Sequence, residues 1–213
     1  MSDRETVMNH IRKAFANVEV PGDDFLQGSF DGCEPYEVVG PFKGRHDWRT
    51  VDAEFLDAHY DALNFFSEAG FRFFLPAYLI ADLQDKLQTA DPVFHLTHGF
   101  SDASVEIPTK TGSFVRRIGK SAFVNPRRFG AMTFYDYAQY RLSVFTKEEA
   151  QAIVAYLRYK RDADPHMLDN DKIDAALNVF WLDRAANAAS AESLKHHVEE
   201  ETRFVAEMDP HVE

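Results

Sequence analysis

The chain has 213 residues, of which 45% are hydrophobic and 19 are phenylalanine, and its formal net charge at pH 7 is −12. This composition supplies enough apolar material for the core of one ordinary domain and excludes global disorder. The negative charge repels polyanions, so it argues against broad affinity for nucleic acids or anionic membranes. The single cysteine, Cys33, excludes an intrachain disulfide and a multi-cysteine zinc module.

The first 15 residues lack the uninterrupted apolar core of a signal peptide. Residues 73–81 are the longest uncharged run in the most hydrophobic stretch, and they are too few to cross a bilayer. A free thiol at Cys33 also suits a reducing compartment. We therefore expect a cytoplasmic protein that does not bind membranes.

The N-terminal half predicts helices separated by one irregular stretch. Val7, Ile11 and Phe15 recur every four residues, which predicts a helix over 5–15. Residues 21–50 are rich in Gly and Pro, so we expect turns or short strands there. A second helix is predicted over 53–64, and Ser67 is typical of the N-cap of a third helical segment. Because Pro76 lies inside that segment, we expect a kink or a new start, with a helix over 77–86.

Residues 93–145 are instead dominated by short runs of Val, Ile, Thr, Phe and Tyr punctuated by Gly and Pro, which predict a small antiparallel sheet. Helices return at 148–160, after a capping box formed by Thr146 and Glu149, and again at 172–186. A last helix carries the apolar residues Leu194, Val198 and Val205.

The predicted fold class is therefore α+β and mainly helical. We divide the chain into a helical domain at 1–164, with the β region 93–145 inserted, and a C-terminal helical segment at 165–213 that packs on it. The predicted core joins these helices, and its members are Phe55, Leu63, Phe71, Phe74, Leu75, Leu79, Ile153 and Leu157.

Four stretches of the first 90 residues resemble an uncharacterised bacterial family, a domain of unknown function. They are AFANVEVPGDD at 14–24, HDW at 46–48, DALNFF at 61–66 and FRFFLPAYLIADL at 71–83. The resemblance implies an N-terminal helix, a buried tryptophan and a bacterial origin. It implies no activity, because the family has none to transfer to particular residues.

Positive charge gathers in one part of this acidic chain. Between Lys110 and Lys147 there are eight basic residues and one acidic residue, a net charge of +7, so the rest of the chain carries −19. Aromatic residues are interleaved with the basic ones, a pattern suited to binding phosphates and stacking bases. The arginines clustered in this segment are the candidate site for an anionic partner: Arg116, Arg117, Arg127 and Arg128. The alternative is that the segment neutralises acidic helices of its own chain or of a second subunit.

Other titratable groups match no catalytic or metal-binding motif. His95 and His98 alternate onto opposite faces of a strand, so they share a metal ion only if the strand ends in a turn. His196, His197, Glu199, Glu200 and Glu201 have helical spacing but are typical of a solvated face. The same holds for Asp47, Asp52, Asp57 and Asp61, while His59 lies on an apolar stripe and Cys33 has no neighbouring base. We predict no catalytic residue, no bound metal and no cofactor.

These observations favour a non-catalytic interaction or regulatory protein, a class that includes immunity proteins, that binds a protein partner or a second copy of itself. One alternative is a hydrolase whose site is built from scattered carboxylates and histidines, since such groups converge in space and not in sequence. A second alternative is nucleic-acid binding through 110–147, which the overall negative charge makes unlikely.

Overall fold

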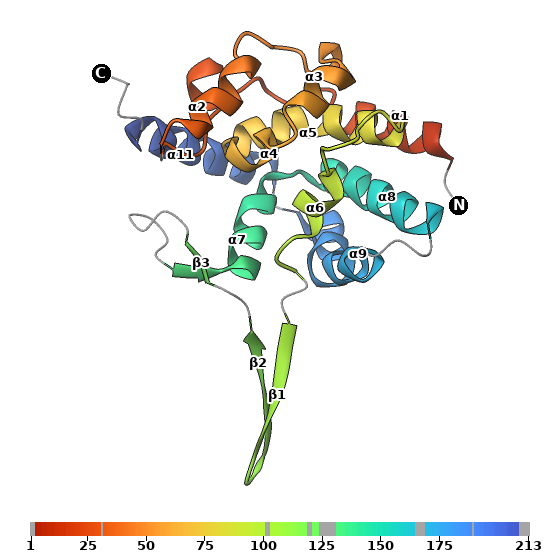
Figure 1. Ribbon diagram of the computed structural model, residues 1–213, viewed down its shortest axis with the longest axis vertical. Coiled ribbons are helices and arrows are strands. Elements are labelled where there is room, and N and C mark those ends of the chain that lie inside the picture. The colour runs from red at the N-terminus through yellow and green to blue at the C-terminus, as the bar shows by residue number, and fades with distance from the viewer. Residues whose placement is uncertain are drawn as a thin grey trace.

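The computed structural model describes residues 3–30, 32–100, 103–118, 121–123, 131–164, 169–188 and 190–208. Its helices are α1 (Arg4–Ala14), α2 (Glu34–Val39), α3 (Ala53–Ala58), α4 (Ala62–Phe65), α5 (Glu68–Leu83), α6 (Pro92–Thr97), α7 (Phe134–Arg141), α8 (Lys147–Ala163), α9 (Asn170–Ala176), α10 (Leu182–Asn187) and α11 (Ala191–Met208). Its strands are β1 (Ala103–Thr109), β2 (Gly112–Ile118), β3 (Ser121–Phe123) and β4 (Ala131–Thr133). The protein is mainly helical, as predicted (Figure 1).

Helix α5 is the centre of the fold, and nearly all of its faces are buried. It begins where the hydroxyl oxygen of Ser67 accepts a hydrogen bond from the backbone amide of Gly70. The expected new start at residue 77 is wrong, because the helix runs through Pro76 without a break. A proline inside a helix costs about 3 kcal/mol. Here that cost is offset by the apolar side chains that the continuous helix buries.

The predicted core is almost entirely confirmed. Seven of its eight residues are fully buried, and only Phe55 remains partly exposed at the edge of the core. The guanidinium carbon of Arg45 covers the Phe55 ring at 3.7 Å from its centroid. The helix predicted over 53–64 is interrupted at His59, which ends α3. The hydroxyl group of Tyr78 donates to the carbonyl of His59, so the break is anchored to α5.

Two clusters of charged and polar side chains join α5 to α8. At one end the guanidinium of Arg72 donates two hydrogen bonds to the carboxylate of Glu149, at 2.9 and 2.8 Å. At the other end Asp82 accepts from the hydroxyl of Tyr156 at 2.7 Å and pairs with Lys160 at 3.0 Å. The two helices therefore run in the same direction. Helix α1 packs against both of them through its buried stripe.

The same glutamate begins α8. The predicted capping box is present: the Thr146 hydroxyl accepts from the Glu149 amide, and the Glu149 carboxylate accepts from the Thr146 amide. Only 2% of Glu149 is exposed to solvent. One buried carboxylate thus satisfies both an arginine from α5 and a free amide at the start of α8.

The predictions for 93–145 are only partly correct. Residues expected in strands form α6 and α7 instead. Helix α6 forms because the Asp91 carboxylate caps the amide of Phe94 and Pro92 occupies the first turn, where a proline is tolerated. The small antiparallel sheet is not confirmed, since the described strands form two separate pairs, β1 with β2 and β3 with β4.

The segment after residue 168 contributes to the core. Trp181 is fully buried in a π-helical turn, Leu177–Trp181, between α9 and α10. Its indole nitrogen donates to the carbonyl of Leu96 at 2.8 Å, and its ring contacts Phe145. Arg184 donates to the carbonyl of Phe145. Helices α9 and α10 are thereby attached to both α6 and the start of α8.

Replacing Glu149 by glutamine is expected to lower the free energy of unfolding by about 3 kcal/mol, because the substitution leaves the partly buried Arg72 guanidinium without a counter-charge. Urea denaturation followed by circular dichroism measures this change. The control is Glu148→Gln, which removes the same charge from the exposed neighbouring position and should change the free energy by less than about 0.5 kcal/mol. Equal midpoints for the two variants would contradict this account of the buried pair.

Candidate functional site

The hairpin formed by β1 and β2 (residues 103–118) extends away from the helices, along the long axis of the molecule (Figure 1). Its two strands pair in antiparallel register from Ala103 opposite Ile118 to Thr109 opposite Gly112. At the tip Lys110 and Thr111 are exposed. Each strand packs extensively only against the other among the described elements. The hairpin is therefore the part of the described chain least supported by the core.

The register distributes the hairpin residues over two faces that differ in character. Directly opposed residues share a face, and successive residues alternate. One face carries three pairs: Ala103 with Ile118, Val105 with Arg116, and Ile107 with Phe114. The other face carries Ser104 with Arg117, Glu106 with Val115, and Pro108 with Ser113. One face of the ribbon is thus mainly apolar and the other is mainly polar.

Two of the four arginines proposed to bind an anionic partner lie on this hairpin. Arg116 and Arg117 are consecutive residues of β2, so the pleat places them on opposite faces. Arg127 and Arg128 lie outside the described residues. The proposed surface of four arginines therefore stays a prediction, with two of its members located on the projecting hairpin.

Three of the aspartates considered as parts of a hydrolytic site accept hydrogen bonds that stabilise the fold. Asp47 accepts from the amide and guanidinium of Arg49, and these bonds, the amide's first, lower the pKa of Asp47. Asp52 caps α3 by accepting from the amide of Phe55. Asp57 accepts from three consecutive amides at residues 88–90, at 2.7 to 3.0 Å. These carboxylates hold turns and helix starts in place.

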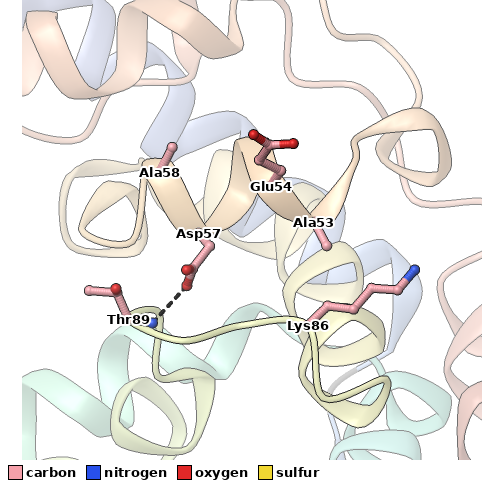
Figure 2. Close-up of a pocket in the computed structure, with 6 residues that line it drawn as sticks. All are labelled: Ala53, Glu54, Asp57, Ala58, Lys86 and Thr89. Carbon is pink, nitrogen blue, oxygen red and sulfur yellow. Dashed lines mark hydrogen bonds between the residues drawn. The ribbon is translucent and has the colours of Figure 1, made fainter.

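A surface hollow lies beside Asp57, between α3 and the loop after α5. Figure 2 shows the Asp57 carboxylate pointing across it to the Thr89 amide, with Glu54 pointing away and Lys86 extending from the opposite rim. The hydrogen bonds from residues 88–90, the Ala90 amide's first, lower the pKa of Asp57. All three amides donate to the same oxygen, Oδ1, so this oxygen of Asp57 holds the loop after α5 against α3.

The histidines differ in their surroundings. His59 Nδ1 lies 2.8 Å from the carbonyl of Phe55, within the aromatic cluster around Phe42, so His59 is a structural residue. His95 and His98 lie on and just after α6, not on a strand, and His98 stacks on the exposed ring of Phe94. In the described part of the chain no group of three His, Cys, Asp or Glu residues is arranged to hold a metal ion.

Among the basic residues of the 110–147 segment whose side chains the structure describes, Arg141 is the one that the fold brings inward. It ends α7 and is half-buried. Its guanidinium lies over the ring of Phe71, 4.5 Å from the centroid, and donates to the carbonyl of Leu63. The ring of His95 contacts the same phenylalanine. Burial first, and then the charges of Arg141 and His98, lower the pKa of His95 to about 3. The contact of both His95 and Arg141 with Phe71 cannot be predicted from sequence spacing, because 46 positions separate His95 from Arg141.

Comparison with protein families identifies residues 3–117 as a match to a family of unknown function, DUF6714. The chain belongs to the DUF6714 family. The match confirms the resemblance drawn from the first 90 residues and extends it to the end of the hairpin. No curated protein and no solved structure matches the chain. Within the described residues, no helix is long and apolar enough to span a membrane.

The DUF6714 match covers only part of the hydrophobic core. The matched residues include α1 and α5, but α8 and the buried Trp181 lie beyond it. Because α1 packs against α8 and Arg72 pairs with Glu149, residues after 117 complete the core of the matched part. In this chain the hydrophobic core therefore includes residues of the DUF6714 segment and residues beyond it.

Replacing Asp57 by alanine is expected to lower the free energy of unfolding by about 1 kcal/mol at pH 7, because three amides lose their acceptor. The folded-state pKa of Asp57 lies below its ordinary value. The carboxylate therefore stabilises the fold at pH values above about 3.9, and this contribution is lost as the pH falls through the folded-state pKa. Urea titrations of both proteins at several pH values measure it. A difference that stayed constant down to pH 2 would contradict the role of the charge.

Proposed function

We propose that this protein acts without catalysis by binding protein, and that its partner is a second copy of the same chain. The β1–β2 hairpin would be the element that makes the contact. The single observation that carries this proposal is the projection of the hairpin away from the helical body, where, among the described elements, its strands pack extensively only against each other (Figure 1).

A projecting hairpin gains stability from a partner. A two-stranded hairpin alone is marginally stable in water, because it has no second layer to cover its apolar face. Here the pairing register gathers Val105, Ile107 and Phe114 on one face. Burying such residues against another surface contributes about 25 cal/mol per Å² of apolar area. Association would therefore order the hairpin and cover its apolar face in one step.

Charge complementarity favours a second copy as the occupant. The segment from Lys110 to Lys147 carries +7, and the rest of the chain carries −19. Within that remainder, the stretch from Glu19 to Glu37 contains six acidic residues and no basic one. Glu34 and Glu37 are exposed on α2. A protein with this charge distribution attracts the hairpin of a neighbouring copy toward its acidic face.

The two surfaces lie at opposite ends of the molecule, with α2 at one end and the hairpin at the other (Figure 1). A contact between unlike surfaces is heterologous, and it closes only if the rotation from copy to copy generates a ring. We therefore expect assemblies larger than a dimer as the protein concentration rises. An isologous dimer would stop at two copies.

Sedimentation velocity tests this proposal with the wild-type chain and with Arg116→Ser/Arg117→Ser. The wild type should associate at low ionic strength and dissociate as the salt concentration approaches about 0.15 M, where charges more than roughly 8 Å apart are screened. The hairpin variant should remain monomeric at both salt concentrations. The matched control, Lys13→Ser/Lys86→Ser, removes two positive charges from exposed positions of the body and should associate like the wild type.

The outcomes separate the alternatives. A monomeric wild type at every concentration would overturn the proposal, as would equal association of the hairpin variant. Adding a short oligonucleotide tests nucleic-acid binding in the same experiment. An oligonucleotide that bound the wild type, with the steep salt dependence of counterion release, would favour the nucleic-acid alternative over self-association.

A further inference from the structure

Arg141 is a half-buried cation without a counter-ion in the described part of the chain. Two other partly buried arginines have carboxylate partners: Arg72 pairs with Glu149, and Arg161 pairs with Asp162 and Asp174. Arg184, like Arg141, donates to backbone carbonyls, but it bonds to two of them, those of Ser143 and Phe145. Arg141 has instead one backbone carbonyl, that of Leu63, and the face of the Phe71 ring. A guanidinium carries five N–H donors in a planar fork. Most of that donor capacity is left for another molecule.

His95 contacts the same aromatic ring, Phe71, as this guanidinium, and it is close enough for the charge of Arg141 to lower its pKa. Its ring centroid is 6.5 Å from that of Phe71, and it packs edge-on against Phe94 at 5.3 Å. Neither ring nitrogen is hydrogen-bonded in the described structure. Because its pKa is lowered to about 3, the imidazole is neutral at pH 7 and keeps one N–H donor and one acceptor. Arg141 and His95 together therefore carry a net charge of +1, and both have hydrogen-bond donors.

We propose that Arg141 and His95 together bind the carboxylate group of a small organic acid. The planar fork of arginine matches the two oxygens of a carboxylate, and the neutral imidazole adds a donor without adding charge. A single positive charge suits a monoanion better than a doubly charged phosphate. Phe94, which is 42% exposed, provides an apolar contact next to His95 for the rest of the acid. This inference is independent of the association of the hairpin.

The chain contains a matched control for this site. Arg45 is also half-buried, its guanidinium lies over the ring of Phe55, and it donates to a backbone carbonyl, that of Pro41. The histidine next to that ring, His59, already has its Nδ1 in contact with the carbonyl of Phe55. The two arginines therefore differ mainly in the neighbouring histidine: His59 has a ring nitrogen 2.8 Å from a carbonyl, whereas neither ring nitrogen of His95 has a hydrogen-bond partner among the described residues.

Titration of ¹⁵N-labelled full-length protein with sodium benzoate, followed by NMR, tests the proposal. Benzoate should shift the imidazole signals of His95 and the side-chain N–H signal of Arg141, and the shifts should saturate. Arg141→Gln should weaken binding by at least about tenfold, since a hydrogen bond to a charged group is lost. Arg45→Gln should leave the affinity unchanged. If Arg141→Gln does not fold, His95→Phe keeps the ring packing and should weaken binding by about fivefold.

Three results would overturn the assignment. The first is the absence of saturable shifts at His95 and Arg141 in the wild type. The second is an equal loss of affinity in Arg45→Gln, which would show a general effect of charge. The third is tighter binding of inorganic phosphate than of benzoate in a parallel titration, which would reassign the site to a different anion. Weaker binding of acetate than of benzoate would support the apolar contact with Phe94.

Discussion

The arrangement of the helices depends on the hydrogen bonds and the ion pair made by the buried carboxylate of Glu149. It closes the capping box at the start of α8 and binds the guanidinium of Arg72 from α5 at the same time. A buried ion pair adds little net stability compared with apolar packing, but breaking it is costly. Its main effect is therefore to fix which residues of α5 meet which residues of α8. The second contact, at Asp82, requires the same alignment ten residues later. Once the two helices are aligned, α1 and the segment around Trp181 pack on the surface that they form.

The same scheme explains where the charges of the protein are used. Acidic side chains such as Asp57 stabilise turns and helix starts of the body. Two basic features carry our proposals. The hairpin that carries Arg116 and Arg117 projects from the helices, and the half-buried Arg141 shares a contact with Phe71 with a neutral histidine, His95. Our two proposals rest on these features, one for a macromolecular partner and one for a small acid.

The sequence predicted those parts of the fold that depend on local chemistry. The capping box at Thr146 and the apolar stripe of α1 could be predicted because the residues that form each of them lie three or four positions apart in the sequence. The interruption of the helix at His59 could not be predicted, because the hydrogen bond that anchors it comes from Tyr78, 19 residues away. Nor was the continuous helix through Pro76, because tertiary burial outweighs the local preference of proline. Residues 134–141 are rich in aromatic residues and were predicted as strand, but they form α7, since packing overrides propensity in short segments.

The candidate sites follow the same rule. The excess of basic residues in 110–147 was visible in the sequence, because charge can be counted without a structure. The shared contact of Arg141 and His95 with Phe71 could not be predicted from the sequence, because it joins α5, α6 and α7. The aspartates of 47–61 looked like a set of carboxylates in the sequence, and the structure gives three of them separate backbone partners.

Hydrogen–deuterium exchange at several protein concentrations tests the central claim, that the hairpin is an association element carried by a self-sufficient helical body. Amides of α5 and α8 should be equally protected at every concentration, because their bonds lie within one chain. Amides of residues 103–118 should exchange rapidly in dilute protein and become protected as the concentration rises, because a second copy would then order the strands. Protection of the hairpin that is the same at all concentrations would contradict the account.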